Sequence, residues 1–109
     1  MAQVEEYRGL VQELLKARVW TRPGVESQTI FDTKRDHYQL VSVGWDDGSH
    51  RVYGTVIHID IKDGKIWIQW DGTENAIADE LVEHGVPHSD IVLGYQSPFK
   101  RQYTDFAVG

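Results

Sequence analysis

The stretch HIDIKDGKIWIQW, residues 58–70, decides how the chain folds. Isoleucine alternates with other residues on both sides of Asp63-Gly64, and Asp-Gly between two alternating segments is a strong signal for a β-hairpin. Because alternate side chains of a strand share a face, the isoleucines point toward a core. His58 and Asp60 then share the opposite face, which is what a sheet with one covered and one wet side produces.

Two further strands are predicted before this hairpin. Residues 25–31 and 37–45 are rich in β-branched and aromatic side chains, and the polar turn DTKRD separates them. Asp47-Gly48 supplies the next turn, ahead of a strand over residues 51–61. Together with the strand over residues 65–70, the pattern predicts a four-stranded antiparallel meander.

Helical periodicity flanks the predicted sheet. In residues 3–20 apolar side chains recur every three or four positions, which is typical of an amphipathic helix, and the segment Thr21–Gly24 ends it. A second helix is predicted over residues 74–84, with Thr73 as its N-cap and Gly85 at its C-terminal cap. This second helix is expected to pack on one face of the sheet.

The C-terminal part of the chain has weaker periodicity. Residues 86–95 predict a short turn followed by a short apolar strand, and the tail over residues 96–109 contains Phe99, Tyr103 and Phe106. A tail that rich in aromatic residues is seldom left free in water. No repeat or linker interrupts this order. The sequence therefore predicts one α+β domain over residues 1–109.

Composition excludes several classes of function. Eleven Lys and Arg against seventeen Asp and Glu give a formal charge of -6, which disfavours direct binding to a phosphate backbone. The basic pairs Lys34-Arg35 and Lys100-Arg101 are separate and form no continuous stripe. The absence of cysteine excludes disulfides and thiolate metal sites. No apolar run approaches a membrane span, and no signal peptide is evident, so we expect a cytoplasmic protein without membrane association.

His58 and Asp60 are the first candidates for chemistry. With Asp71, they would serve a metal-dependent nuclease or hydrolase as metal ligands, or as a base and its orienting acid. However, the H-x-D spacing is the default for any strand, and no second histidine lies at ligand spacing nearby. Gly85 and Pro87 also break the spacing between His84 and His88. The sequence therefore predicts no catalytic residues, no bound metal and no cofactor. The alternative is the metal-dependent nuclease or hydrolase that uses His58, Asp60 and Asp71.

A protein-binding surface is the second kind of site. Trp67 falls on the sheet face away from the isoleucines, which suggests cover by the tail or a partner surface, whereas Trp45 and Trp70 are expected in the core. The acidic face of the second helix would suit a basic partner. The candidate partner surface consists of Trp67, Asp79, Glu80, Glu83, Phe99, Lys100, Arg101 and Phe106.

Long runs of this sequence closely resemble the XisI family, the fdxN element excision controlling factors of cyanobacteria. The runs include DHYQLV (36–41), HIDIKDGKIWIQ (58–69), and DIVLG (90–94) through SPFKRQYTDFAVG (97–109). The resemblance implies a small α+β protein that controls programmed removal of a DNA element during heterocyst differentiation. It also implies a XisH-like protein encoded nearby, which resembles a nuclease fold, and it supplies no catalytic residues.

Sequence and resemblance together predict a regulatory adaptor. An acidic protein that carries exposed aromatic residues would control DNA rearrangement by binding a protein, the XisH-like one, and would cover a basic surface on it. We therefore expect no enzymatic activity of its own. A homo-oligomer that buries sheet edges and the aromatic tail is compatible with this function.

Overall fold

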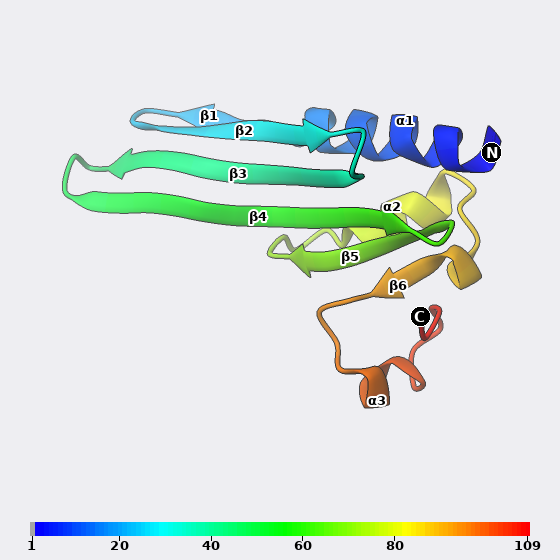
Figure 1. Ribbon diagram of the computed structural model, residues 1–109. Helices are drawn as coiled ribbons and strands as arrows, with labels where there is room; N and C mark the ends of the chain where they lie inside the picture. Colours follow the sequence, from blue (N-terminus) through cyan, green and yellow to red (C-terminus); the bar gives the residue numbers. More distant parts are fainter. Residues whose placement is uncertain (1) are drawn as a thin grey trace.

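The computed structural model describes residues 2–109 and contains one six-stranded sheet with helices packed against it (Figure 1). The strands are β1 Thr21–Arg22, β2 Val25–Asp32, β3 His37–Asp46, β4 His50–Lys62, β5 Lys65–Asp71 and β6 Ile91–Leu93. The helices are α1 Ala2–Ala17, α2 Ile77–Glu83, the 3₁₀ helix η1 His88–Asp90 and α3 Pro98–Arg101. The strands lie in the sheet in the same order as in the chain.

The predicted α+β class is confirmed, but the four-stranded antiparallel meander is wrong in two respects. Thr21–Arg22, predicted as the end of the first helix, forms an additional edge strand because Pro23-Gly24 turns it back onto β2. At the other edge, the short C-terminal strand β6 joins the same sheet and runs parallel to β5. A parallel neighbour requires a crossover connection, and α2 lies in that connection.

The predicted hairpin turns are confirmed. Asp47 and Gly48 have φ angles of 53° and 72°, and Asp63 and Gly64 have φ angles of 54° and 76°. Positive φ at both central residues is the geometry of a type I′ turn. Asp63-Gly64 directly joins the paired Lys62 and Lys65, whereas Ser49 adds a third residue between the paired Asp46 and His50. These two turns align β3, β4 and β5 and thereby determine which side chains meet across the strands.

The core lies on one face of the sheet, which we call the inner face. Its strand residues are fully or almost fully buried: Tyr38, Leu40, Ile57, Ile59, Ile61, Ile66, Ile68 and Ile91. Helices α1 and α2 cover them with Tyr7, Val11, Leu14, Leu15, Ile77, Ala78 and Leu81. We call the opposite side the outer face. The isoleucine alternation therefore placed the core correctly, with His58 and Asp60 on the outer face.

Both helix boundaries differ from the prediction. Helix α1 ends at Ala17 instead of continuing to residue 20. Helix α2 begins at Ile77 instead of residue 74, and Thr73 is not its N-cap. Asp71 takes that function: its Oδ2 accepts a hydrogen bond from the Ile77 backbone N–H at 2.8 Å, and its Oδ1 accepts one from the Thr73 N–H at 2.9 Å.

A β-bulge at Gln69 explains why Trp70 does not lie in the core. Ile59 pairs with Ile68, but the next residue of β4, His58, pairs with Trp70, so that Gln69 is an extra residue in β5. The bulge shifts the alternation by one position. Trp70 therefore turns to the outer face and is 52% exposed, whereas Asp71 turns to the inner face, where it caps α2.

Strands β1 to β4 continue well beyond the helices as a projection, clearly visible in Figure 1. We call the projecting residues 21–28, 41–46 and 50–55 the β-arm. The molecule measures 44 × 31 × 24 Å, and its radius of gyration of 14.7 Å exceeds the roughly 13 Å typical of a compact domain of about 100 residues. Trp45 lies near the end of the arm and is 50% exposed, so its predicted place in the core is wrong.

The C-terminal tail closes the β6 edge of the sheet. The Ala107 backbone N–H donates to the Ile91 carbonyl at 2.8 Å, and Ala107 forms a parallel bridge with Val92. Phe106 packs partly buried against the core. On the helical side, the Tyr7 hydroxyl of α1 donates to Asp90 of η1 and ties the two ends of the chain together. No helix within residues 2–109 combines the length and apolarity that a bilayer span requires.

The capping function of Asp71 can be tested by substitution. Asp71→Ala removes the acceptor for the Ile77 amide, the first of α2, and is expected to lower the free energy of unfolding by about 1–2 kcal/mol. Urea denaturation followed by circular dichroism measures this change. Glu74→Ala, which removes an exposed carboxylate a few residues away, is the matched control. Equal effects of the two substitutions would show that Asp71 does not cap the helix.

Candidate functional site

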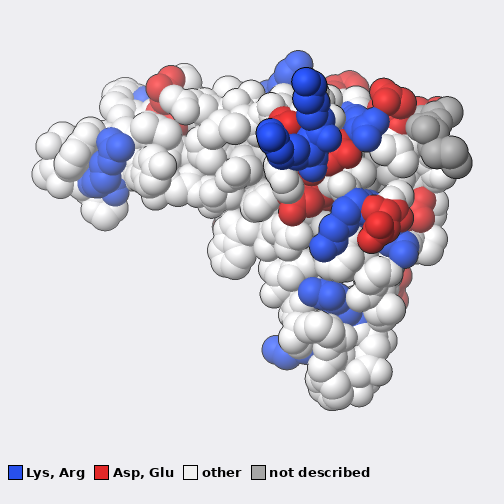
Figure 2. Space-filling view, in the orientation of Figure 1, with Lys and Arg blue, Asp and Glu red and all other residues white. Residues whose placement is uncertain are grey.

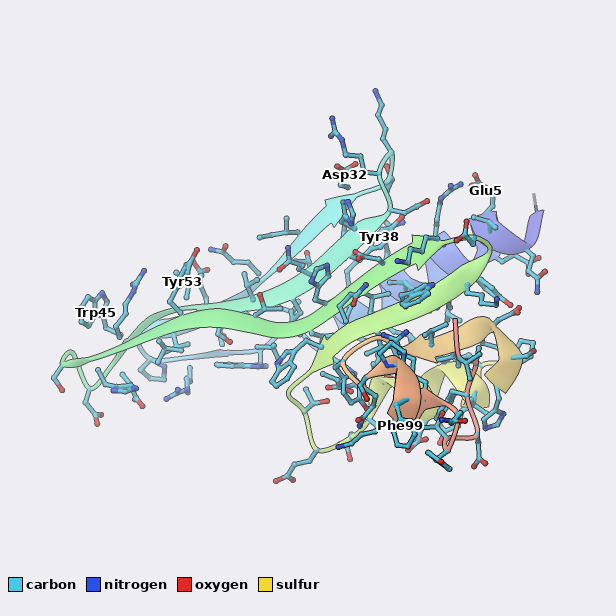
Figure 3. All side chains as sticks on the ribbon, turned by 60° about the horizontal axis from the view of Figure 1, so that its bottom comes forward. Glu5, Asp32, Tyr38, Trp45, Tyr53 and Phe99 are labelled. Atoms are coloured by element: carbon cyan, nitrogen blue, oxygen red, sulfur yellow. The ribbon has the colours of Figure 1, made fainter. Side chains whose placement is uncertain are left out.

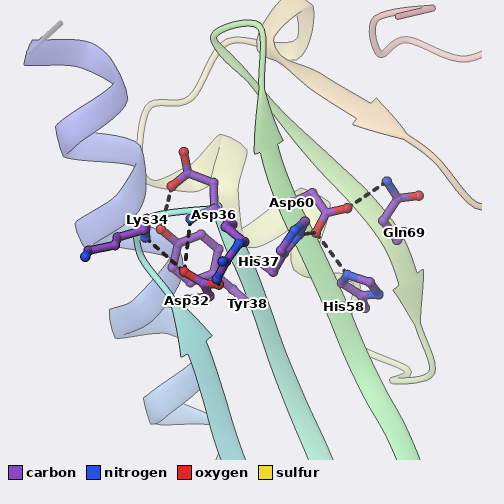
Figure 4. Close-up of polar contacts among 9 residues, drawn as sticks. Asp32, Lys34, Asp36, His37, Tyr38, His58, Asp60 and Gln69 are labelled. Atoms are coloured by element: carbon purple, nitrogen blue, oxygen red, sulfur yellow. Dashed lines mark hydrogen bonds and ion pairs between the residues drawn. The ribbon is translucent and has the colours of Figure 1, made fainter.

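Asp60 is the centre of a polar cluster on the outer face (Figure 4). One carboxylate oxygen, Oδ1, lies 2.7 Å from His37 Nδ1 and 2.9 Å from His58 Nε2. The other oxygen, Oδ2, accepts a hydrogen bond of 3.1 Å from the Gln69 side-chain amide. Two imidazoles therefore converge on one oxygen while an amide holds the second. We call these four residues the Asp60 cluster.

Three neighbouring strands bring the Asp60 cluster together. His37 is the first residue of β3 and pairs directly with Asp60 on β4. His58 lies two residues before Asp60 on the same strand, so the two side chains share the outer face. Gln69 reaches the cluster from β5 at the position of the bulge. Side chains held by paired strands are more rigidly positioned than side chains on loops.

The Asp60 carboxylate is kept in its charged form. Burial of the side chain would raise the pKa of Asp60, but hydrogen bonds from His37 and His58 outweigh burial, and the pKa of the carboxyl lies below its ordinary value. Among residues 2–109, no Lys or Arg forms an ion pair with Asp60; its nearest polar partners are the two histidines and Gln69. The cluster is thus an anionic oxygen held between two ring nitrogens.

Two of the four members of this cluster, His58 and Asp60, lie together as predicted, whereas His37 and Gln69 were not predicted to join them. No second histidine lies at ligand spacing in the sequence, but strand pairing brings His37 beside Asp60. Asp71 does not belong to the cluster. Its carboxylate lies on the inner face, bonded to Thr73 and Ile77. A nuclease or hydrolase site built from His58, Asp60 and Asp71 is therefore inconsistent with this arrangement.

A second polar network supports the position of His37. The Arg8 guanidinium of α1 donates two hydrogen bonds to the Asp36 carboxylate, at 2.8 and 3.0 Å. The Tyr38 hydroxyl donates to the same carboxylate at 2.8 Å. The hydrogen bond from Arg8 is the main reason that the pKa of Asp36 lies below its ordinary value. The start of β3 is thereby fixed to α1, one residue before His37.

The predicted partner surface divides into two separate parts. On α2, Asp79 and Glu83 are exposed, whereas Glu80 is partly buried in an ion pair with Arg18 at 3.0 Å. An open groove of about 820 Å³ lies beside them, and its opposite side includes Arg18 and Trp20. The freely exposed acidic residues of this helix are thus fewer than the sequence suggested.

The tail forms the second part of the predicted surface. Phe99 is 67% exposed and stacks edge-on with Tyr103, with ring centroids 5.4 Å apart. Arg101 lies over the Trp67 ring at 5.2 Å, and Lys62 lies over it at 4.0 Å. Trp67 is therefore on the outer face as predicted but is covered in part, and Phe106 faces the core rather than solvent. Lys100 is exposed beside Phe99.

A further set of exposed apolar side chains lies elsewhere, on the outer face. Four of its side chains are half or more exposed: Ile30 at 50%, Trp45 at 50%, Tyr53 at 75% and Trp70 at 52%. Strand pairing places the partly buried Val41 and Val43 on the same face. We call these six residues the outer-face patch. Most of the β-arm surface in Figure 2 is uncharged, and Figure 3 places Trp45 and Tyr53 along the arm, far from Phe99.

The outer-face patch was missed because Trp45 and Trp70 were expected in the core. Arg51 lies over both the Trp45 and Tyr53 rings, at 5.4 and 5.5 Å, and is the one cation that covers them among the residues described. Helices α1 and α2 pack on the inner face, so neither covers these side chains.

Comparison with known proteins gives consistent matches over almost the whole chain. The family model described as XisI protein matches residues 1–108. A XisI-like protein of known structure from Anabaena variabilis ATCC 29413 is 51% identical, with a TM-score of 0.88, and the match covers 95% of this chain and 97% of that chain. The fdxN element excision controlling factor XisI from the same organism is 37% identical, with a TM-score of 0.83 and coverage of 98% and 99%. No curated protein matches the chain.

The stabilising effect of the Asp60 cluster can be measured directly. Asp60→Ala removes the acceptor shared by His37, His58 and Gln69 and is expected to lower the free energy of unfolding by about 1–2 kcal/mol. Asp60→Asn keeps one carbonyl acceptor and is expected to cost less. Urea denaturation of both variants tests this order, with Asp105→Ala, an exposed aspartate of the tail, as the control. A stability of Asp60→Ala equal to that of the control would refute it.

Proposed function

The chain belongs to the XisI family, and from this membership we propose that it is a non-catalytic accessory protein in the excision of a DNA element. It acts by binding a protein partner, a XisH-like protein, rather than by cutting or joining DNA. A related protein of this fold is described as the fdxN element excision controlling factor, which supports a function in DNA rearrangement for this chain. The proposal places the contact with the partner on the outer-face patch.

The exposure of the outer-face patch is the observation that carries this proposal. An antiparallel sheet with one solvated face ordinarily presents polar side chains there. Here the solvated face presents Trp45, Tyr53 and Trp70 with half or more of each side chain exposed. Tryptophan and tyrosine are the residues most enriched at the energetic centres of protein interfaces. Exposed apolar patches of this kind mark interaction sites.

The projection of the β-arm points to the same conclusion. Ordering a strand costs conformational entropy, which burial of side chains normally offsets. No helix covers the outer face of the arm, so its apolar side chains contribute little to the stability of the isolated chain. A partner that covers Trp45 and Tyr53 would remove their apolar surface from water and would supply the missing burial.

The charge of the molecule supports a basic partner. The formal charge of -6 and the exposed Asp79 and Glu83 on α2 create a field that attracts positive surfaces and repels DNA. A protein that handles DNA carries basic surface, so the partner and this chain are complementary in charge. Such complementarity increases the rate of association more than it increases affinity. The net negative charge, to which α2 contributes from the inner face, thus accelerates encounter, and the outer-face patch holds the complex.

The docking surface can be tested with a matched pair of tyrosines. Tyr53 on the arm and Tyr103 on the tail are 75% and 73% exposed. We expect that Tyr53→Ser, alone or with Trp45→Ser, weakens binding of a co-expressed XisH-like protein at least about tenfold, because each removes an aromatic contact at the interface. Tyr103→Ser is expected to leave binding unchanged. Light scattering behind a sizing column, followed by titration calorimetry, measures both.

Three outcomes would contradict the docking proposal. One is the absence of any mixed complex at low salt. Another is a complex that Tyr103→Ser weakens and Tyr53→Ser does not, which would transfer the contact to the tail. The third is a homo-oligomer of this chain that Tyr53→Ser dissociates while binding of the XisH-like protein is unchanged, which would assign the patch to a second copy.

The steering function of α2 requires a different measurement. Charge reversal by Asp79→Lys with Glu83→Lys is expected to lower the association rate and to reduce its dependence on salt, with little change in the dissociation rate. Surface plasmon resonance at low and high salt separates the two rates. Glu80 is left intact because its ion pair with Arg18 contributes to the fold. An unchanged association rate at low salt would exclude the acidic helix from the encounter.

A further inference from the structure

We propose that His37, His58 and Asp60 form a binding site for a divalent transition-metal ion, with Zn²⁺ as the ion that best fits their donor atoms. The three side chains offer two imidazole nitrogens and one carboxylate oxygen, which is a common ligand set for zinc. The inference does not depend on the proposed partner, because all three ligands come from this chain. A metal site on the outer face is a property that the family name does not describe.

The geometry of the three donor atoms supports the site. His37 Nδ1, His58 Nε2 and a carboxylate oxygen of Asp60 all lie within 4.8 Å of one another. Zinc binds nitrogen and oxygen at about 2.0–2.1 Å, so that neighbouring ligand atoms of a tetrahedral site are about 3.3 Å apart. The contacts from Asp60 to the two rings are 2.7 and 2.9 Å. The Asp60 oxygen and the two ring nitrogens must therefore move apart by roughly 0.5 Å to admit the ion, and small side-chain rotations provide this movement.

The second oxygen of Asp60 is already fixed by an outer partner. The Gln69 amide donates to Oδ2 at 3.1 Å and leaves Oδ1 directed at the two histidines. Metal-binding carboxylates are typically held by hydrogen bonds of this kind, which orient the ligand before the ion arrives. Gln69 follows the inward-facing Ile68 at the bulge of β5, and its side chain lies on the outer face. A residue of the neighbouring strand therefore supplies the outer support of the proposed site.

The environment of the cluster favours a cation over a purely structural hydrogen-bond network. Asp60 is only 17% exposed at its side chain and forms no ion pair with Lys or Arg among residues 2–109. The imidazoles of His37 and His58 are 52% and 33% exposed at their side chains, so coordination positions beyond the three ligands face solvent. The site is open, with room for water or for a ligand atom from another molecule.

The ligand set also determines which ions are excluded. Mg²⁺ and Ca²⁺ prefer sites made almost wholly of oxygen atoms, whereas imidazole nitrogen suits Zn²⁺, Co²⁺ and Ni²⁺. Binding of Zn²⁺ with no competition from Mg²⁺ is therefore the expected selectivity. This selectivity separates a built site from general attraction of cations to an acidic protein, because general attraction would not distinguish the two ions.

Titration calorimetry of chelator-treated protein with Zn²⁺ tests the proposal. We expect one ion per chain with a Kd of about 10 µM or tighter. His37→Ala and His58→Ala should each weaken binding at least about tenfold, and Gln69→Ala about tenfold through loss of the support for Asp60. His50→Ala is the matched control, because His50 is an exposed histidine on the same strand, β4, outside the cluster. A millimolar excess of Mg²⁺ should not displace Zn²⁺.

Co²⁺ provides an independent readout of the ligands. Binding at the site should produce visible absorption bands in the parent chain and in His50→Ala but not in His58→Ala. Circular dichroism confirms that each variant is folded, and His37→Gln, at the exposed first position of β3, replaces any variant that does not fold. No stoichiometric Zn²⁺ binding by the folded parent, or equal binding by the His37, His58 and His50 variants, would overturn the proposal and leave the cluster as a hydrogen-bond network alone.

Discussion

One extra residue in β5 determines much of the structure. The bulge at Gln69 reverses the inward and outward alternation between Ile68 and Trp70. Asp71 thereby reaches the inner face and caps α2, while Trp70 turns to the outer face. A regular strand would have buried Trp70 and exposed Asp71, and α2 would have lost the acceptor for its first amide. The same local irregularity thus connects the helical layer with the outer-face patch, and it lies beside the Asp60 cluster.

The parts of the fold that were predictable are those in which local chemistry and hydrophobic pattern agree. The Asp-Gly turns and the isoleucines of β4 and β5 placed the hairpin and the core correctly. The bulge at Gln69 was not visible, because Trp70 suits either face and no polar residue broke the alternation. Strand β6 joins the sheet by a crossover, and the pairing of so short a strand depends on tertiary packing rather than on its own sequence.

The Asp60 cluster was only partly predictable, because the pairing of Asp46 with His50 that sets the register of β3 against β4 comes from the structure and not from the sequence. If β3 and β4 paired regularly from Asp46 and His50, the outward-facing His37 would lie opposite the inward-facing Ile59. Paired residues share a face, so this mismatch requires one extra residue. The register does shift between Leu40 and Val41, and His37 therefore pairs with Asp60. The outer-face patch was not predictable either, since tryptophan suits either face of a strand and α1 and α2 cover only the inner one.

Because the strands lie in the sheet in chain order, each antiparallel pairing closes only a short loop and loses little loop-closure entropy. Other contacts close much longer loops, among them the parallel pairing of β6 with β5 and the hydrogen bond that joins Tyr7 to Asp90 across most of the chain. Both lie at the helical end of the molecule. The β-arm is therefore built mainly by pairing of strands that follow one another in the chain, while the entropic cost of the topology is concentrated where α1, α2 and η1 meet the sheet.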